Sequence, residues 1–142
     1  MAGRFVIACA LGDLQVAQQL FGQHREVLNM RDSVCYDRKG LMAALHNNRS
    51  SVSSWLAWLD NLQLSVSDDD NQTALHWAAM KCSDQKIITR LLTISDQKVI
   101  NQVNTAGETA LDLAVRYNNP GAVECLGRDP RTDWRRQEEH VE

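Results

Sequence analysis

Two segments of the chain repeat one pattern at a fixed distance. Residues 71–79 are Asn-Gln-Thr-Ala-Leu-His-Trp-Ala-Ala and residues 107–115 are Gly-Glu-Thr-Ala-Leu-Asp-Leu-Ala-Val, so Thr, Ala, Leu and a later Ala recur 36 residues apart. Self-similarity at such a period indicates stacked supersecondary units, each too small to bury its apolar face alone. This periodicity constrains the fold more than any other feature of the sequence.

The period extends back to the start of the chain, which gives four units. Each unit has an apolar residue, a small residue three positions later, and then an apolar pair spaced i, i+4. The first column is Phe5, Leu41, Leu75 and Leu111, the second is Ala8, Ala44, Ala78 and Ala114, and the pairs are Val16/Leu20, Val52/Leu56, Ile87/Leu91 and Ala122/Leu126. Because residues spaced i, i+4 share one face of a helix, each unit is predicted to hold two helices joined by a tight turn.

Local signals predict the ends of these helices. Thr73 and Thr109 can cap the first-turn amides of the first helices of units three and four. Turns are expected at 12–13, 48–49, 82–83 and 118–119, and second helices over about 14–22, 50–60, 85–95 and 120–127. Pro120 suits a first helical turn, where its missing N–H costs no hydrogen bond. Unit three carries one extra residue around 82–84.

Residues 68–79 and 104–114 resemble the ankyrin repeat family, whose units contain Asp-x-x-Gly-x-Thr-Pro-Leu-His-x-Ala-Ala. Residues 12–20, Gly-Asp-Leu-Gln-Val-Ala-Gln-Gln-Leu, resemble the family's second-helix segment. The resemblance implies an all-α fold, an ankyrin-repeat solenoid of stacked helix-turn-helix units joined by β-turn-like loops. Unit two departs from the pattern, because Lys39-Gly40 stands where Thr-Pro is usual, and unit one, with Gly3 at the threonine position, is expected to be a terminal cap.

The repeats define the expected domain organisation. An ankyrin repeat domain is predicted over 1–127, with units at about 3–34, 35–68, 69–104 and 105–127. Residues 128–142 form a charge-rich tail in which Trp134 is the only large apolar group. This tail is expected either to begin a further repeat of a longer array or to fold back over the last unit.

Composition narrows the functional class. The net charge is −3 without a long block of one sign, so the basic face typical of nucleic-acid binding is not expected. The apolar runs fall far short of the roughly 20 residues that cross a membrane. Four cysteines without a Cys-x-x-Cys pair are expected to be free thiols of a reducing compartment: Cys9, Cys35, Cys82 and Cys125. These observations predict an intracellular protein of the cytoplasm or nucleus, with no membrane insertion.

Candidate catalytic or metal-binding residues are few. The resemblance implies a structural role for His76, whose ring would bond to the backbone of a neighbouring loop, and no second ligand recurs at metal spacing. A Cys-His nucleophile could be formed by Cys82 with His76 or by Cys35 with His46, but neither pair lies in a catalytic signature. The sequence therefore predicts a protein that is not an enzyme and that needs neither cofactor nor metal.

Aromatic and acidic residues offer alternatives to packing. Trp77 is expected to pack against the next unit, whereas of Trp55 and Trp58 one should pack and the other could be exposed, in a second contact or dimer surface on the convex side. The acidic run 68–70 lacks the spacing of a calcium loop. It is expected to be a solvated loop tip or a contact for a basic partner.

The resemblance implies that a partner protein, of unknown identity, binds a concave surface made by the loop tips and the ends of the first helices. The residues at these positions are Asp69, Asp70, Gln72, Thr105, Ala106, Glu108, His46, Asn47, Met80, Lys81, Arg116 and Tyr117. The expected function is thus a protein–protein interaction module, as a monomer or with weak self-association. The alternative is a structural or self-associating segment of a larger ankyrin array or scaffold.

Overall fold

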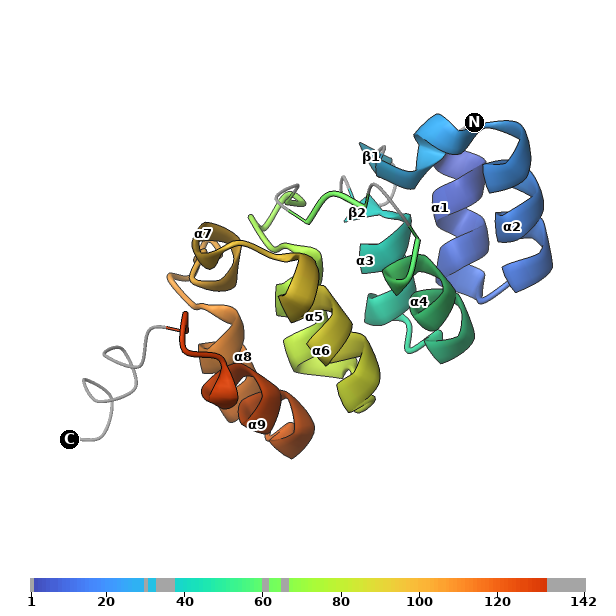
Figure 1. Cartoon of the computed structure of the whole chain (residues 1–142). Coiled ribbons are helices and arrows are strands. Elements are labelled where there is room, and N and C mark those ends of the chain that lie inside the picture. The colour runs from blue at the N-terminus through green and yellow to red at the C-terminus, as the bar shows by residue number, and fades with distance from the viewer. Residues whose placement is uncertain (1, 30, 33–37, 60–61, 65–66, 133–142) are drawn as a thin grey trace.

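The computed structural model describes residues 2–29, 31–32, 38–59, 62–64 and 67–132 (Figure 1). Four pairs of helices follow one another along the stack. The first helices of the pairs are α1 (Ala2–Leu11), α3 (Gly40–His46), α5 (Ala74–Lys81) and α8 (Ala110–Arg116). The second helices are α2 (Leu14–Gln23), α4 (Ser50–Ala57), α6 (Gln85–Ile94) and α9 (Pro120–Arg128). The predicted all-α solenoid is confirmed.

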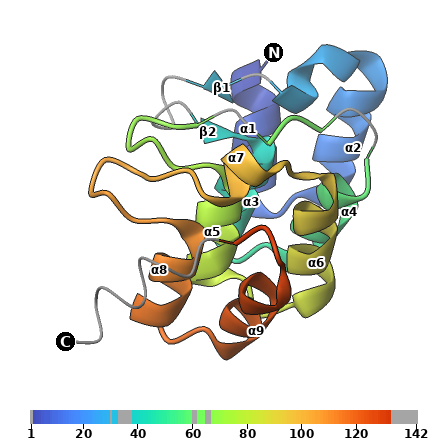
Figure 2. The same ribbon diagram turned by 60° about the vertical axis from the view of Figure 1, so that its left-hand side comes forward.

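The helices form two parallel rows (Figure 2). In the inner row α1 packs on α3, α3 on α5 and α5 on α8, and in the outer row α2, α4, α6 and α9 pack in the same order. The connections between units hold short elements that the sequence did not predict. These are a 3-10 helix η1 (Arg25–Asn29), helix α7 (Gln97–Ile100), and strands β1 (Arg31–Asp32) and β2 (Arg38–Lys39), which pair antiparallel.

One apolar core runs through the whole stack. The predicted columns of Phe, Leu and Ala on the first helices are buried, and so are the apolar pairs of the second helices, except that Val16 is only partly buried. Each unit therefore covers the apolar face of the unit before it, which is the packing expected when no unit is stable alone.

The predicted caps and turns are also present. Thr73 and Thr109 cap α5 and α8, and Pro120 occupies the first turn of α9. The turns between the two helices of units one, two and four contain a left-handed residue, namely Gly12 (φ 78°), Asn48 (φ 59°) and Asn118 (φ 53°). The second helix of unit two is shorter than expected, because it ends at Ala57 and its predicted final residue 60 lies outside the described residues.

Gly40 replaces the proline usual in the family because the neighbouring unit fills the space beside it. A Cβ atom at this position would lie 2.6 Å from Phe5 Cε2 and 3.0 Å from Cys9 Sγ, and both of these side chains are fully buried. The buried ring of Phe5 thus requires glycine at the start of α3.

We expect Gly40→Ala to lower the free energy of unfolding by about 1–2 kcal/mol, because an overpacked core must shift its neighbours. The matched control is Gly22→Ala in α2, where an added Cβ meets no atom within 4 Å. That change should raise the stability by up to about 1 kcal/mol, since alanine favours a helix. Urea denaturation followed by circular dichroism measures both, and equal effects of the two changes would contradict this account of Gly40.

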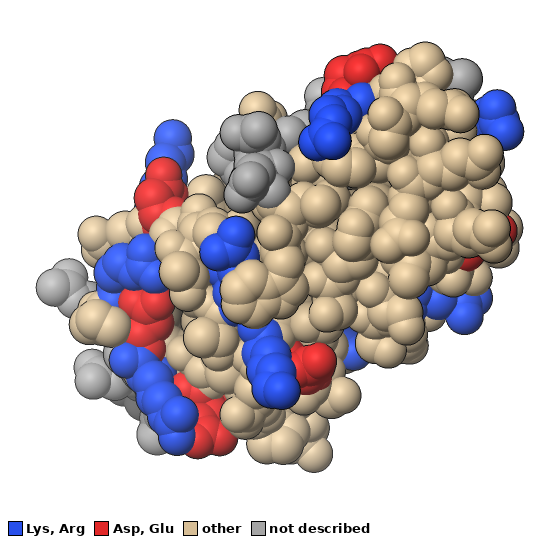
Figure 3. All heavy atoms as spheres, turned by 45° about the vertical axis from the view of Figure 1, so that its right-hand side comes forward, with Lys and Arg blue, Asp and Glu red and all other residues tan. Residues whose placement is uncertain are grey.

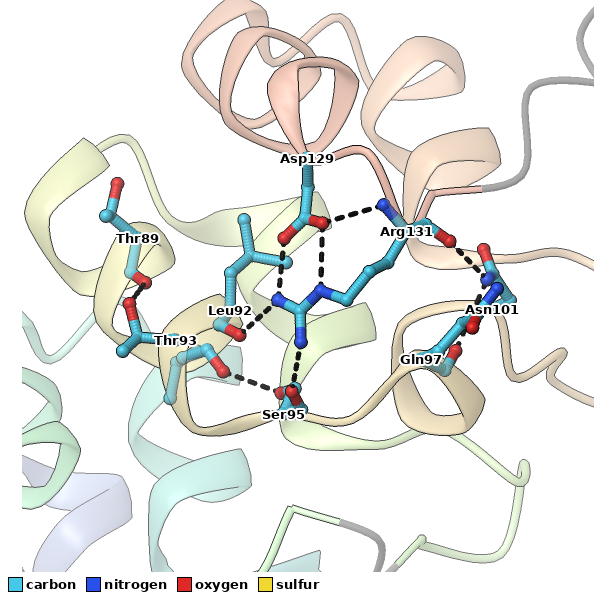
Figure 4. A network of polar contacts seen from close by, with 9 residues as sticks. Thr89, Leu92, Thr93, Ser95, Gln97, Asn101, Asp129 and Arg131 are labelled. Carbon is cyan, nitrogen blue, oxygen red and sulfur yellow. Dashed lines mark hydrogen bonds and ion pairs between the residues drawn. The ribbon is translucent and has the colours of Figure 1, made fainter.

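The segment after α9 returns to unit three (Figure 4). The guanidinium of Arg131 donates to the carbonyl oxygens of Ser95 (2.6 Å) and Leu92 (2.8 Å) at the end of α6, and it pairs with Asp129 (2.7 Å). The hydrogen bond from Arg131 lowers the pKa of Asp129 below its usual value. Asn101 also donates to the Arg131 carbonyl (2.8 Å). Residues 129–132 therefore contact the last two units, whereas Trp134 and the rest of the tail lie outside the described residues.

Candidate partner-binding surface

The loops that precede α5 and α8 share one turn geometry. The backbone N–H groups of Asp68 and Asn104 each donate to the carbonyl oxygen four residues later, at 3.0 and 2.9 Å. The fourth residue of each turn, Asn71 (φ 57°) or Gly107 (φ 78°), has a left-handed backbone. Glycine and asparagine tolerate this conformation better than other residues. Asn71 can thus stand where the family usually has glycine.

The first residue of each loop fixes the turn with its side chain. Oδ1 of Asp68 accepts hydrogen bonds from the backbone N–H groups two and four residues later, both at 3.0 Å, and Oδ1 of Asn104 does the same. Oδ2 of Asp68 also accepts from Nε1 of the buried Trp77 (2.9 Å). The expectation of a solvated acidic tip therefore holds for the exposed Asp69 and Asp70 but is wrong for Asp68, which is 7% exposed.

Hydrogen bonds join the two loops to each other. Thr105 N donates to the Asp70 carbonyl oxygen (3.0 Å), and Nδ2 of Asn71 donates to the Val103 carbonyl oxygen (2.8 Å). The loops project side by side beyond the first helices (Figure 2). Because they are tied together through the backbone, a partner would meet one continuous surface across units three and four.

The predicted loop residues differ in how much surface they offer. Thr105 and Ala106 are exposed, and Glu108 is half-buried. Gln72 is buried, and its Oε1 accepts from Nδ2 of Asn104 (3.1 Å). Gln72 therefore connects the two loops and contributes little accessible surface.

The residues predicted at the end of α8 lie together at the foot of the second loop. Nη1 of Arg116 lies 3.0 Å from Oε2 of Glu108, and its guanidinium carbon lies 5.5 Å from the ring centroid of Tyr117. The Arg116 and Tyr117 side chains are both exposed. This group combines an aromatic ring with a partly paired cation, and both residue types are enriched in protein interfaces.

The corresponding residues of units two and three continue this surface along the inner row. The half-buried ring of His46 contacts Trp77 edge to face, with ring centroids 4.7 Å apart. Asn47 is exposed and donates from Nδ2 to the Ala43 carbonyl oxygen (2.9 Å). Met80 is half-buried and Lys81 is exposed. The predicted helix-end residues thus lie at the ends of three adjacent helices, α3, α5 and α8.

Unit one extends this row with apolar residues that the sequence analysis missed. Leu11, at the end of α1, is 66% exposed, and Ile7 on the same helix is 46% exposed. Leu11, Lys81 and Tyr117 occupy equivalent positions at the ends of α1, α5 and α8, since all three lie six residues after the first apolar column. Extending that column to unit one would have identified it.

A second exposed aromatic group lies on the outer row. Trp55 is half-buried and contacts Phe21 edge to face, with ring centroids 5.7 Å apart, whereas Trp58 is 60% exposed. The guanidinium carbon of Arg90 lies 4.9 Å from the Trp58 ring centroid, and Nε of Arg90 donates to the Ala57 carbonyl oxygen (2.9 Å). The expectation that one tryptophan packs and the other is exposed is confirmed.

His76 and the cysteines have structural surroundings. Nδ1 of His76 accepts from Thr73 N (3.1 Å), and Nε2 contacts the Glu108 carbonyl oxygen (3.1 Å), so its predicted bond to a neighbouring loop is confirmed. Burial raises the pKa of the Cys82 thiol and raises that of Cys9 to about 12, which favours the unreactive protonated form. Cys35, the candidate nucleophile that would pair with His46, lies outside the described residues.

Acidic and basic side chains alternate over the left-hand part of the face in Figure 3, and a broad area without them lies to the right of its centre. Within the described ranges, no three or more His, Cys, Asp or Glu side chains form a group that could hold a metal ion. Nor does the described part of the chain contain a helix long and apolar enough to cross a membrane.

The paired helices, the threonines that cap them and the hydrogen-bonded loops define a stack of ankyrin repeats. Comparison with known protein families agrees. A family model described as ankyrin repeats in three copies matches residues 5–101 and 41–136, so the chain belongs to the ankyrin repeat family. Members of this family are generally non-catalytic modules of protein–protein interaction.

Two curated relatives are much longer than this chain. An ankyrin repeat domain-containing protein, SAT10, of Stachybotrys chartarum is 31% identical over 122 residues, which are 84% of this chain and 6% of that protein. The phosphatidylinositol 3,4,5-trisphosphate-dependent Rac exchanger 1 protein of Mus musculus is 36% identical over 86 residues, 60% of this chain and 5% of that protein. The chain thus spans about a twentieth of the length of these relatives.

Proposed function

We propose that this chain binds a partner protein through the concave surface formed by its loops and first helices. The observation that carries the proposal is the pair of loops before α5 and α8, which are hydrogen-bonded to each other and present exposed side chains beside the exposed ends of those helices. A surface whose backbone is already ordered loses little conformational entropy on binding. Arg116 and Tyr117 are its central anchors, with Met80 and Lys81 beside them.

The experiment compares partner capture by three forms of the chain. The wild type, a Met80→Ala/Arg116→Ala/Tyr117→Ala variant and a control changed on the outer row, Lys86→Ala/Thr93→Ala, serve as bait, and the captured protein is identified and its affinity measured by calorimetry. The concave variant should bind at least tenfold more weakly, since interface anchors commonly contribute more than about 1.4 kcal/mol each. The outer-row control should bind like the wild type.

Circular dichroism checks that both variants remain folded. A partner that binds the concave variant and the wild type equally would refute the proposed surface. If only the outer-row control failed to bind the partner, the binding site would instead lie on the face around Trp58.

The alternative is a structural or self-associating segment of a larger array, and one observation favours it. Val115 is 49% exposed, although the residues at the same place in the three earlier units, Cys9, Leu45 and Ala79, are buried. This face of α8 would accept a further repeat. Light scattering of the isolated chain separates the two functions, because self-association that disappears in Val115→Glu would support stacking.

A further inference from the structure

The turn that joins the two helices of unit three, α5 and α6, differs from the corresponding turns of the other three units. In unit two the N–H of Arg49 donates to the Ala44 carbonyl oxygen (2.8 Å), and units one and four have the same bond, which closes a tight turn. Unit three has one more residue here, and its Ala78 carbonyl oxygen instead accepts from Cys82 N (2.8 Å). Cys82 has an extended backbone (φ −96°, ψ 121°). The turn of unit three is therefore wider.

In units two and four, one side chain hydrogen-bonds the turn of its unit to the turn of the unit before it. The residue at this position is different in unit three. Nδ2 of Asn119 donates back to the carbonyl oxygens of Ala79 (3.0 Å) and Cys82 (2.7 Å), and thus fastens unit four to unit three. Nε of Arg49 fastens unit two to unit one through the Ala10 carbonyl oxygen (3.0 Å). The residue at this place in unit three is Asp84, whose carboxylate has no proton to donate. The turns of units two and three are consequently not bridged in this way.

A cavity of about 180 Å³ lies between these two turns. It is much larger than the roughly 15 Å³ that a single buried water needs. Its lining includes the apolar side chains of Leu45 and Ile87, the cations Arg49 and Lys81, the hydroxyl-bearing Ser53, and Asp84. Lys81 is exposed and stands at the open side of the cavity, whereas the Arg49 side chain lies against unit one, where its Nε donates to the Ala10 carbonyl oxygen.

Hydrogen-bond donors that have no side-chain acceptor among the described residues line this cavity. α4 starts at Ser50 beside it, and the residue before the helix, Arg49, supplies no side-chain hydrogen bond to the first turn, whereas Asp13, Asp84 and Asn119 do so for their helices. The start of a helix carries a partial positive charge and free amides. Independently, the Ser53 hydroxyl is buried (the residue is 2% exposed) and has no hydrogen-bond partner within the described part of the chain.

We propose that this cavity binds a carboxylate group, which accepts hydrogen bonds from the first turn of α4 and from the Ser53 hydroxyl. Lys81 supplies the opposite charge, and Leu45 and Ile87 contact the methylene groups that carry the carboxylate. The Asp84 carboxylate beside the cavity repels a dianion such as phosphate more strongly than it repels a singly charged carboxylate. The carboxylate can belong to the glutamate side chain of a protein or to a small organic acid.

The experiment is a titration of the full chain followed by ¹⁵N–¹H NMR. The probes are propionate, the peptide acetyl-Gly-Glu-Gly-amide, its uncharged Gln counterpart, and inorganic phosphate. Saturable shifts of the amides of residues 50–53 are expected with both carboxylates, with a dissociation constant on the order of 1 mM. Tighter binding of the peptide assigns the site to a protein side chain, and tighter binding of propionate assigns it to a small acid.

Three variants make the test specific. Ser53→Ala should weaken binding at least fivefold, while Ser51→Ala, an exposed serine on the same helix, should leave it unchanged. Arg49→Asp should abolish binding, because its own carboxylate would cap α4 as Asp13 caps α2. Equal shifts with the Glu and Gln peptides, stronger binding of phosphate, or unchanged binding in Ser53→Ala would overturn the proposal. The concave-surface variant should bind the probes normally, so this site and the proposed function can fail separately.

Discussion

Replacing Asp68 with alanine is expected to lower the free energy of unfolding by about 3 kcal/mol, although Asp68 belongs to an acidic run that looks solvated. Asp68 is 7% exposed, and its carboxylate accepts hydrogen bonds from the N–H groups of Asp70, Gln72 and the Trp77 indole. Hydrogen bonds to a charged group contribute about 1.5–3 kcal/mol each and are not additive within one network. The change removes the acceptor from a turn and from a buried tryptophan together.

Urea denaturation at neutral pH measures this loss, and two variants make it specific. Asp69→Ala changes the exposed neighbour and should alter the stability by no more than about 0.5 kcal/mol. Asp68→Asn keeps one acceptor oxygen and should cost less than Asp68→Ala, because Asn104 fixes the equivalent turn with its amide oxygen alone. If Asp68→Ala and Asp69→Ala had the same small effect, Asp68 would not be the residue that holds this loop.

The helical framework could be predicted from the sequence because it depends on apolar periodicity and local capping. The burial of the Leu75 and Leu111 column and the caps at Thr73 and Thr109 follow from spacing and residue type alone. Asp68 was not predicted, because a carboxylate is expected on the surface unless its partners are known. Those partners are two backbone amides of the turn, in which Asn71 has a left-handed backbone, and the indole of Trp77 in the helix that follows.

From the sequence, the residues of the candidate surface could be given only as positions along the chain, and not as an arrangement in space. The sequence locates the loop tips, but it does not show that Gln72 turns inward to Asn104. It also shows the extra residue near Cys82, yet the cavity arises from the distance between this turn and the turn that contains Arg49. Contacts between side chains of different units depend on how the units stack, and a repeat pattern does not contain that information.

The stability of the domain is expected to fall as the pH drops below 6.5, because of His76. The His76 ring is fully buried. Its Nδ1 accepts a hydrogen bond from Thr73 N and therefore carries no proton. The ring proton is then on Nε2, which donates it to the Glu108 carbonyl oxygen. Protonation would place a second proton on Nδ1, against the Thr73 N–H. Burial, the largest cause, lowers the pKa of His76 below its ordinary value of 6.5.

The unfolded chain therefore binds a proton at His76 near pH 6.5, whereas the folded chain binds it only at a lower pH. The contribution of neutral His76 is complete above pH 6.5 and decreases as the pH falls toward the folded pKa, by at most about 1.4 kcal/mol per pH unit. His76→Gln keeps a donor and an acceptor without a titratable group. It should be about 1–3 kcal/mol less stable than the wild type at pH 7.5, since the geometry of both bonds is disturbed.

The decisive measurement is the stability difference between the wild type and His76→Gln, from urea denaturation at several pH values between 7.5 and 5.0. This difference should shrink as the pH falls, because only the wild type loses the contribution of neutral His76. The other histidines are common to both proteins, so their titration largely cancels in the comparison. Two parallel curves would mean that His76 binds its proton equally well in the folded and unfolded chain, and its ring would then not be the buried neutral link between units three and four.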